Sequence, residues 1–207
     1  MTSPQRRIQP RKRPRQARAE LTRQRIIAAA ARVFGEYGYA AGTTNRIAEE
    51  ARISIGSLYQ YYPNKDAILA ELLTRHLDGD EPIATLRGYA DSPEPLDVIV
   101  RAFARTVIEH HLDDPQLLRV MIEQAPRSGE LQEKMARQDR AVTGLVRDLI
   151  DRHPEIHVAD KETAARLVTS TLELVVHQLI AAPGSIDTTR LENELVVMIT
   201  GYLRAGR

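Results

Sequence analysis

The stretch ISIGSLYQYYPNK, residues 53–65, decides how the N-terminal third of the chain folds. It places three tyrosines within four positions, although the 207 residues include only 7 Tyr, 2 Phe and no Trp. Ser54 is a candidate N-cap, because its hydroxyl can accept a hydrogen bond from the first turn of a helix. Pro63 cannot continue a helical hydrogen-bond ladder, so a short helix from Ile55 is predicted to end before it.

This helix is predicted to have one buried and one exposed face. Leu58 and Tyr62 lie four positions apart and share the inward face. The outward side is formed by Ser57, Gln60 and Tyr61, with Tyr59 at its edge. Exposed tyrosine beside Ser and Gln suits DNA, where a hydroxyl reaches phosphate or a ring lies along deoxyribose. One tyrosine is therefore expected in the core and two at a DNA surface.

Helices are predicted on both sides of this stretch. Apolar side chains in residues 20–37 follow one helical face, and Gly38 can adopt the left-handed conformation that ends a helix. Thr43 and Thr44 are N-cap candidates for a short helix, and Asn64 can cap the helix that follows Pro63. Two short helices joined by a tight turn between longer helices describe a helix-turn-helix unit.

The longer stretch FGEYGYAAGTTNRIAEEARISIGSLYQYYPNKDAIL, residues 34–69, resembles the DNA-binding signature of the TetR family of bacterial transcriptional regulators. The resemblance covers about residues 21–73 and rests on F-x-E-x-G-Y, T-T, I-A and S-x-G-S-L-Y-x-Y-x-x-N-K in that order. It departs at Arg52, where the family usually has glycine in the turn. A left-handed residue with a side chain costs about 1 kcal/mol. We expect either a different turn or a compensating phosphate contact.

The resemblance implies DNA contacts for eight residues: Thr44, Arg46, Ser54, Ser57, Tyr59, Gln60, Tyr61 and Lys65. Thr44 and Lys65 are expected to bind phosphates at helix starts, and Arg46 to reach phosphate or guanine. Gln60 is the best candidate for base recognition, since its amide can pair with adenine N6 and N7. Capping or plain solvent exposure remains the alternative for each of them.

Charge is distributed unevenly along the chain. Residues 1–66 carry thirteen Lys/Arg against five Asp/Glu, whereas the whole chain has a net charge of only +1. A basic end on an acidic body indicates a polyanionic partner for the first third. Residues 1–17 are too polar to offset their ordering entropy, so they are expected to form a disordered basic arm that binds DNA. A solvated charge run is the alternative.

From about residue 93 the chain is predicted to be all helical, which makes the fold class all-α. The amphipathic segments are residues 95–112, 114–125, 128–153, 161–182 and 188–205. Residues 78–92 are expected to form a kinked helix end or a loop. The predicted division is therefore the arm, a helix-turn-helix domain over residues 18–66, and a ligand-binding and dimerisation domain over residues 67–207.

Residues 162–182 are apolar on more than one face, which indicates burial on both faces. The resemblance implies that this helix and residues 188–204 form a four-helix homodimer interface with the partner chain. The apolar positions expected there are Leu167, Leu174, Leu195 and Met198. A central core helix of a monomer is the alternative.

The resemblance also implies a cavity for a small molecule inside each C-terminal bundle. Apolar walls with a few polar groups suit a hydrophobic or amphipathic ligand. The candidate wall residues are Phe103, Val107, His111, Met121, Ile122, Gln124, Met135, Thr171, Leu172 and Val175. The sequence pattern does not separate cavity wall from core.

No catalytic or metal-binding motif is present. The sequence lacks glycine-rich nucleotide loops, G-x-S-x-G, H-E-x-x-H and Glu-x-x-His pairs, and it has no cysteine. His110 and His111 are adjacent and are expected to point apart, and Pro154 separates His153 from His157. We therefore expect no enzyme, no metal and no cofactor.

The helical pattern and the resemblance to the TetR family together imply a cytoplasmic, homodimeric, all-helical repressor that binds a palindromic operator in double-stranded DNA and leaves it on binding a small molecule. Its two DNA-binding units would lie about 34 Å apart, or a multiple of that distance, and the ligand would shift the population away from this spacing. A transcriptional activator with the same DNA-binding unit is the nearest alternative. A helical ligand carrier or enzyme with an incidental basic end is the alternative from another class.

Overall fold

The computed structural model describes residues 14–112, 115–124, 128–182 and 186–205. Within these ranges the chain forms ten α-helices and no strand, so the predicted all-α class is confirmed. The helices are α1 (Pro14–Ala41), α2 (Thr44–Glu50), α3 (Ile55–Tyr59), α4 (Lys65–His76), α5 (Glu81–Gly88), α6 (Leu96–Leu112), α7 (Pro115–Gln124), α8 (Gly129–Arg152), α9 (Lys161–Ala181) and α10 (Thr188–Arg204).

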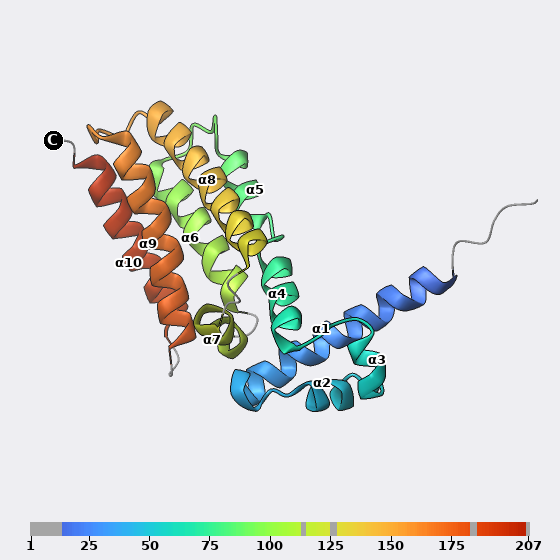
Figure 1. Ribbon diagram of the computed structural model, residues 1–207. Coiled ribbons are helices and arrows are strands. Elements are labelled where there is room, and N and C mark those ends of the chain that lie inside the picture. Colours follow the sequence, from blue (N-terminus) through green and yellow to red (C-terminus); the bar gives the residue numbers. More distant parts are fainter. Residues whose placement is uncertain (1–13, 113–114, 125–127, 183–185, 206–207) are drawn as a thin grey trace, which may run out of the picture.

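The helices form two parts, which we call the head (residues 14–66) and the body (residues 67–205). In the head, α2 and α3 lie along one side of the long α1, and α4 rises from the head into the body (Figure 1). In the body, α6 packs against α9 and α10, and α8 packs against α9, while α7 lies between α1 and α9. Among the described helices, none is both long and apolar enough to cross a membrane.

The short helices of the head begin at side-chain caps. The caps are Thr43 for α2, Ser54 for α3 and Asn64 for α4, each accepting a hydrogen bond from a backbone N–H in the first turn. Such a cap contributes about 1 kcal/mol. All three were expected from the sequence, and they explain why α2 and α3 can be so short.

A glycine-containing bend joins α1 to α2. Gly38 has φ of 71°, as the sequence predicted, and it interrupts the helical conformation inside α1. Gly42 then passes close to the fully buried ring of Phe34, so that an added Cβ would lie only 2.5 Å from that ring. The bend therefore needs glycine at one position for its dihedral angles and at the other for space.

Two predicted boundaries differ from the structure. The first helix begins at Pro14, so residues 14–17 of the predicted arm are helical, while residues 1–13 lie outside the described ranges. Helix α5 occupies part of the 78–92 segment, and Pro82 stands in its first turn. In both helices the proline is at the start, where its missing N–H would have no partner and costs little.

The body is held by an apolar core and by one nearly buried ion-pair group. Glu192 on α10 is only 8% exposed, and it accepts hydrogen bonds from Arg105 and Arg101 on α6. The bonds from Arg105 and then Arg101 hold the pKa of this carboxyl group below its usual value. This cluster fixes α10 against α6 in a defined register.

Candidate nucleic-acid interface and ligand cavity

Helix α3 lies on the side of the head away from the body (Figure 1), and the exposed residues around it are mostly polar. Leu58 is fully buried and anchors the helix, whereas Tyr59 and Gln60 are exposed. The exposed Ser54 caps the helix, and its Oγ lies 2.8 Å from Oγ of the half-buried Ser57. This surface offers hydroxyl and amide groups that can donate and accept hydrogen bonds, as groove and phosphate contacts require.

The three tyrosines of the opening stretch have three different surroundings. Tyr62 is buried, as predicted, and its hydroxyl accepts a hydrogen bond from Arg23. Tyr59 is 52% exposed, with its hydroxyl 3.2 Å from the hydroxyl of Thr44 on α2. Tyr61 was expected to point outward, yet it is half-buried and packs against the core. Helix α3 ends at Tyr59, so helical periodicity no longer sets the direction of Tyr61.

The two candidate phosphate-binding cations differ in their freedom. Arg46 is exposed, and its guanidinium group lies 4.3 Å from the centre of the Tyr37 ring. Lys65 donates a 2.8 Å hydrogen bond to the carbonyl of Tyr39, and its Nζ lies 4.0 Å from the centre of the Tyr39 ring. Lys65 therefore stabilises the bend after Gly38, whether or not it also contacts DNA.

Arg52 adopts the left-handed conformation that glycine usually supplies in this turn. Its φ is 54°, the only positive φ of a non-glycine residue in the described ranges. The turn therefore keeps the glycine-type conformation, and the alternative of a different turn is wrong. Arg25 on α1 donates hydrogen bonds to the carbonyls of Ala51 and Arg52. These bonds offset part of the strain without any DNA contact.

We expect Arg52→Gly to raise the free energy of unfolding by up to about 1 kcal/mol, because it removes the left-handed strain. Arg52→Ala is the matched control, since it removes the same charge and keeps the strain. Urea denaturation of both variants measures the difference. Equal stability of the two variants would mean that the turn is not strained.

A second measurement tests whether the Arg52 side chain also binds a phosphate. If it does, both variants should lower the salt slope of DNA binding by about one.

A cavity of about 300 Å³ lies in the body between α4, α6, α7, α8 and α9. Seven of the ten predicted wall residues line it: Phe103, Val107, His111, Met121, Ile122, Met135 and Leu172. Gln124 instead lies at an exposed groove beside α1, and Thr171 and Val175 do not line the cavity. Which positions of α9 reach the cavity depends on the orientation of the helix, which the sequence pattern does not provide.

Polar groups that the sequence did not single out also line this cavity. Thr169 is only 3% exposed, and its hydroxyl has no hydrogen-bond partner in the described part of the chain. A buried unpaired hydroxyl costs about 1–3 kcal/mol. Glu173 also lines the cavity, where desolvation and then the carboxylate of Asp139 raise its pKa. The cavity is thus mostly apolar with a few polar groups, of which the Thr169 hydroxyl has no hydrogen-bond partner in the described part of the chain.

Four histidines meet at this cavity, which we call the histidine cluster: His76 on α4, His110 and His111 on α6, and His177 on α9. The rings of His110 and His111 are 5.1 Å apart between centres, so the expectation that they point apart is wrong. Burial, and secondarily the neighbouring histidines, lower the pKa of His76 and His177 to about 4 and that of His111 to about 3. Only His111 was a predicted wall residue.

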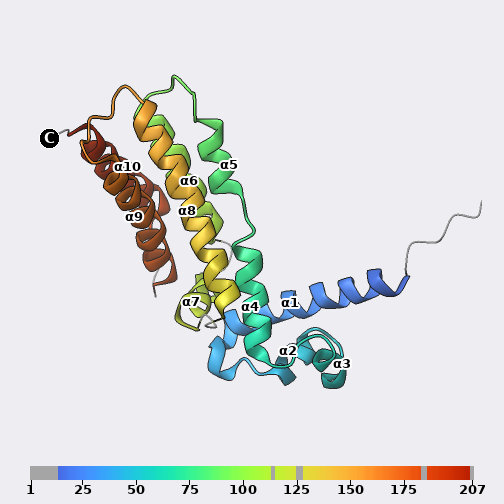
Figure 2. The ribbon, with the colours of Figure 1, turned by 45° about the horizontal axis from the view of Figure 1, so that its top comes forward.

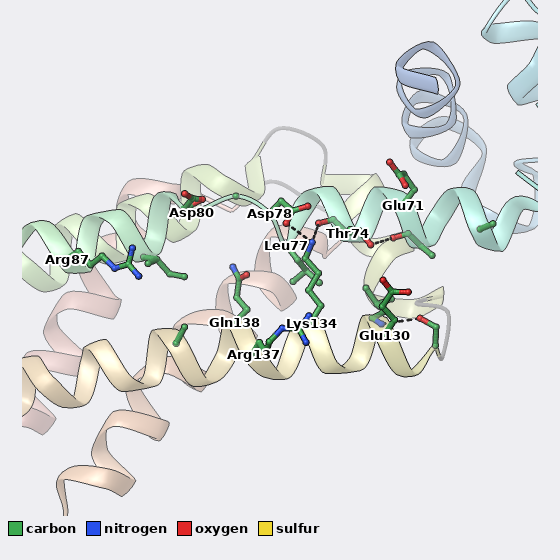
Figure 3. A pocket seen from close by; sticks show the side chains of 17 residues that line it. Glu71, Thr74, Leu77, Asp78, Asp80, Arg87, Glu130, Lys134, Arg137 and Gln138 are labelled. Carbon is green, nitrogen blue, oxygen red and sulfur yellow. Dashed lines mark hydrogen bonds and ion pairs between the residues drawn. The ribbon is translucent and has the colours of Figure 1, made fainter. Parts of the chain in front are cut away.

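A polar groove between α4, α5 and α8 adjoins this region, and Figure 3 shows it from close by. Lys134 on α8 reaches across it and donates hydrogen bonds to the carbonyl of Thr74 and to the carboxylate of Asp78. These contacts tie α8 to the C-terminal end of α4. Since α4 also begins shortly after α3, it connects the cavity wall with the exposed polar surface of α3.

The outer faces of α9 and α10 expose several large apolar side chains. These are Leu167, Leu174, Val197, Met198 and Tyr202, with exposed fractions between 40% and 68%. Leu195, which was expected on this face, is only 2% exposed and belongs to the core of the protomer. Leu195 is therefore excluded as a position that contacts a partner chain. Val197 is exposed on this face, and it was not predicted there from the sequence. Figure 2 shows α9 and α10 together at one side of the body.

Comparison with known proteins agrees with this architecture. Residues 95–203 match the family described as "Tetracyclin repressor-like, C-terminal domain", and residues 26–72 match "Bacterial regulatory proteins, tetR family". HbdR, an HTH-type transcriptional regulator of Aromatoleum sp. (strain CIB), is 46% identical over 59 residues, 28% of this chain and 26% of HbdR. The HTH-type transcriptional repressor SCO4008 of Streptomyces coelicolor is 29% identical over 144 residues, 63% of this chain and 70% of the repressor.

Solved structures share the helical fold over most of the chain. A bacterial regulatory protein of the tetR family from Rhodococcus RHA1 superposes with a TM-score of 0.69 at 22% identity, covering 88% of this chain and 96% of that one. The fatty acid degradation regulator FadR of Bacillus halodurans gives 0.65 at 20% identity, covering 94% and 99%. The chain belongs to the TetR family, whose members are DNA-binding transcriptional regulators rather than enzymes.

Proposed function

We propose that this protein is a cytoplasmic repressor that binds a palindromic operator as a homodimer and leaves it when a small hydrophobic or amphipathic effector enters the body. The observation that carries the proposal is the coexistence of two surfaces joined by α4. One is the exposed polar surface of α3, and the other is the cavity lined by the end of α4. The similarity to SCO4008, named a repressor, supports repression over activation.

The proposed DNA contacts use the exposed residues of the head. Gln60 is exposed, so its amide can reach a base edge, while Ser54 and Tyr59 offer hydroxyls to phosphate. Arg46 supplies a cation at the edge of the same surface. Lys65 donates a hydrogen bond within the head and Tyr61 packs against the core. We therefore propose that these two residues contribute less to DNA binding than the sequence implied.

The proposed effector is apolar with at least one polar group. The cavity is at the small end of the range for ligand sites, about 300–1,000 Å³. The unpaired hydroxyl of Thr169 would gain a partner from a polar group of the effector. Two proteins of this fold are named as a fatty acid degradation regulator and a ketosteroid transcriptional regulator, which is in keeping with an apolar effector here.

The proposed transmission runs through α4. Leu73, His76 and Leu77 at the end of this helix line the cavity, and Lys134 fixes the same end to α8. An effector that fits better when this end moves outward would shift the population toward conformers with displaced heads. In a dimer, two displaced heads no longer match successive major grooves about 34 Å apart.

Selection of binding sites from random DNA by the purified protein tests this proposal. We expect an enriched inverted repeat whose half-sites are one or more helical turns apart. Gln60→Ala should lose preference at one base pair per half-site, with a cost of about 1–3 kcal/mol there, and should keep its affinity for random DNA. Gln132→Ala, the same substitution at an exposed glutamine of α8 in the body, is a control that should leave the selected sequence unchanged.

Two outcomes would contradict the proposal. If no sequence is enriched, the protein does not bind a specific operator. If single, unpaired half-sites are enriched, it does not bind its operator as a dimer. A reporter gene with the selected site placed at its promoter separates repression from activation. Deletion of the regulator should raise expression if it represses, and lower expression if it activates.

A further inference from the structure

The histidine cluster brings together four of the six histidines of the chain, from three helices that are distant in sequence. The ring centres are 4.5 Å apart for His76 and His110, 5.1 Å for His76 and His111, and 4.2 Å for His111 and His177. One ring nitrogen each of His76, His110 and His111 lies within 4.8 Å of the others. We propose that His76, His110, His111 and His177 bind one divalent transition-metal ion of the zinc class, such as Zn²⁺, Co²⁺ or Ni²⁺.

The hydrogen bond of His111 prepares it as a metal ligand. Its Nδ1 lies 2.6 Å from the carbonyl oxygen of Val107 in the preceding turn. A carbonyl can only accept, so Nδ1 carries the hydrogen and Nε2 keeps a free lone pair. Metal-bound histidines commonly donate their second nitrogen to a backbone carbonyl in this way, which fixes the tautomer and the ring direction.

The lone pair of His111 Nε2 faces another imidazole nitrogen. His177 Nε2 lies only 2.5 Å from it, so in the absence of an ion His177 Nε2 donates its hydrogen to His111 Nε2. A tetrahedral zinc-class ion with bonds of about 2.0–2.1 Å places its ligand nitrogens about 3.3 Å apart. Binding of the ion therefore requires side-chain rotations that open this pair and draw the four nitrogens together, because His177 lies outside the group of three within 4.8 Å. His177 would then carry its proton on Nδ1.

The surroundings of His110 support the same assignment. The carboxylate of Glu81 lies 3.6 Å from His110 Nδ1, on the side away from the ion if Nε2 is the ligand. A carboxylate behind a histidine ligand orients the ring and increases its basicity. Gly79 leaves the space that the ring occupies, because a Cβ there would lie 2.5 Å from His110 Cε1 and 2.8 Å from the Glu81 carboxylate.

The ligand set indicates the class of ion. Four imidazoles without thiolate or a dominant carboxylate suit zinc, nickel, cobalt or copper, whereas magnesium and calcium prefer oxygen. The sequence alone does not suggest this site, since no pair of these histidines has the i, i+3 or i, i+4 spacing of a single-helix motif. Only the packing of α4, α6 and α9 brings the side chains together.

The site would fasten the end of α4 to the body through His76. An ion at this position stabilises one arrangement of α4 relative to α6 and α9, and so it would change the affinity for the operator. This consequence rests on the proposed function, whereas binding of the ion does not. Metal binding in the absence of DNA therefore tests the site, and operator binding with and without Zn²⁺ tests the consequence separately.

The experiment uses full-length protein without an affinity tag, treated with a chelator and then dialysed. Titration with Zn²⁺ by calorimetry should give one ion per chain with micromolar affinity or better. Titration with Co²⁺ should produce the intense visible bands of a four-coordinate site, and Zn²⁺ should displace them. His111→Gln and His177→Gln should each abolish the intense Co²⁺ bands and weaken Zn²⁺ binding by more than about 10–100-fold, the range for outer-shell changes.

His157→Gln is the matched control, because His157 is an exposed histidine outside the cluster and should leave the titration unchanged. His76→Gln, at a half-buried helix end, provides a ligand variant that retains the fold if His111→Gln proves unstable by circular dichroism. Weak, multiple-site binding by the wild-type protein, or wild-type affinity in His76→Gln and His177→Gln, would overturn the proposal and leave a hydrogen-bonded cluster on the cavity wall.

Discussion

Val197→Glu should convert a dimeric protein into a folded monomer that binds its operator about 10²–10⁴-fold more weakly. Val197 is 68% exposed on the outer face of α10, beside Met198 and close to the apolar outer face of α9. In a two-fold dimer the same patch meets itself, so one substitution introduces two carboxylates into the contact. Burying a charge without a partner costs free energy and so destabilises the dimer. A monomer has one head only, so it loses the added operator affinity that two linked heads provide.

Sedimentation velocity at micromolar concentration and DNA titration by fluorescence anisotropy measure both effects. Val98→Glu is the matched control, since it is the same substitution at an exposed valine of α6 in the body, outside the α9 and α10 faces. We prefer Val197 to Leu174, because Leu174 also lines the cavity and its replacement would change two sites together. A dimer that persists in Val197→Glu would place the interface elsewhere. A monomeric wild-type protein would contradict the two-headed mechanism.

Much of the head could be predicted because its structure is decided by local chemistry. The caps, the left-handed Gly38 and the end of α3 before Pro63 each depend on residues within one helical turn. The burial of Tyr62 likewise followed from its spacing to Leu58. Tyr61 was misplaced because α3 ends at Tyr59, two residues before it, whereas the helix was expected to continue up to Pro63.

The body was predictable in outline but not in detail. Amphipathic spacing gave its helices, yet α9 and α10 each carry more apolar positions than one face can hold. Which of them face the core depends on packing, so Leu195 was assigned to the wrong face and Val197 was overlooked. Thr169 and the histidine cluster were missed for the same reason, since only tertiary contacts bring them to one cavity.

Leu58→Ala should destabilise the head by about 2–5 kcal/mol, the cost of removing a large buried side chain and leaving a cavity. Leu58 is fully buried and is the only buried residue within the five residues of α3. A helix of this length has no stability of its own in water, so its position depends on that anchor and on the Ser54 cap. The loss is a large part of the usual 5–15 kcal/mol of domain stability.

The consequence should be selective, because the proposed dimer contacts lie in the body. The variant should remain dimeric by sedimentation and keep most of its helical circular dichroism, while binding to selected operator DNA is lost. Leu21→Ala removes the same atoms from a leucine of the head that is 61% exposed, and it should change neither stability nor dimerisation. Urea denaturation measures the difference between the two variants. Equal stability and equal operator affinity in Leu58→Ala and Leu21→Ala would mean that other contacts hold α3, and the buried leucine could then no longer explain how so short a helix presents Gln60 and Tyr59 to DNA.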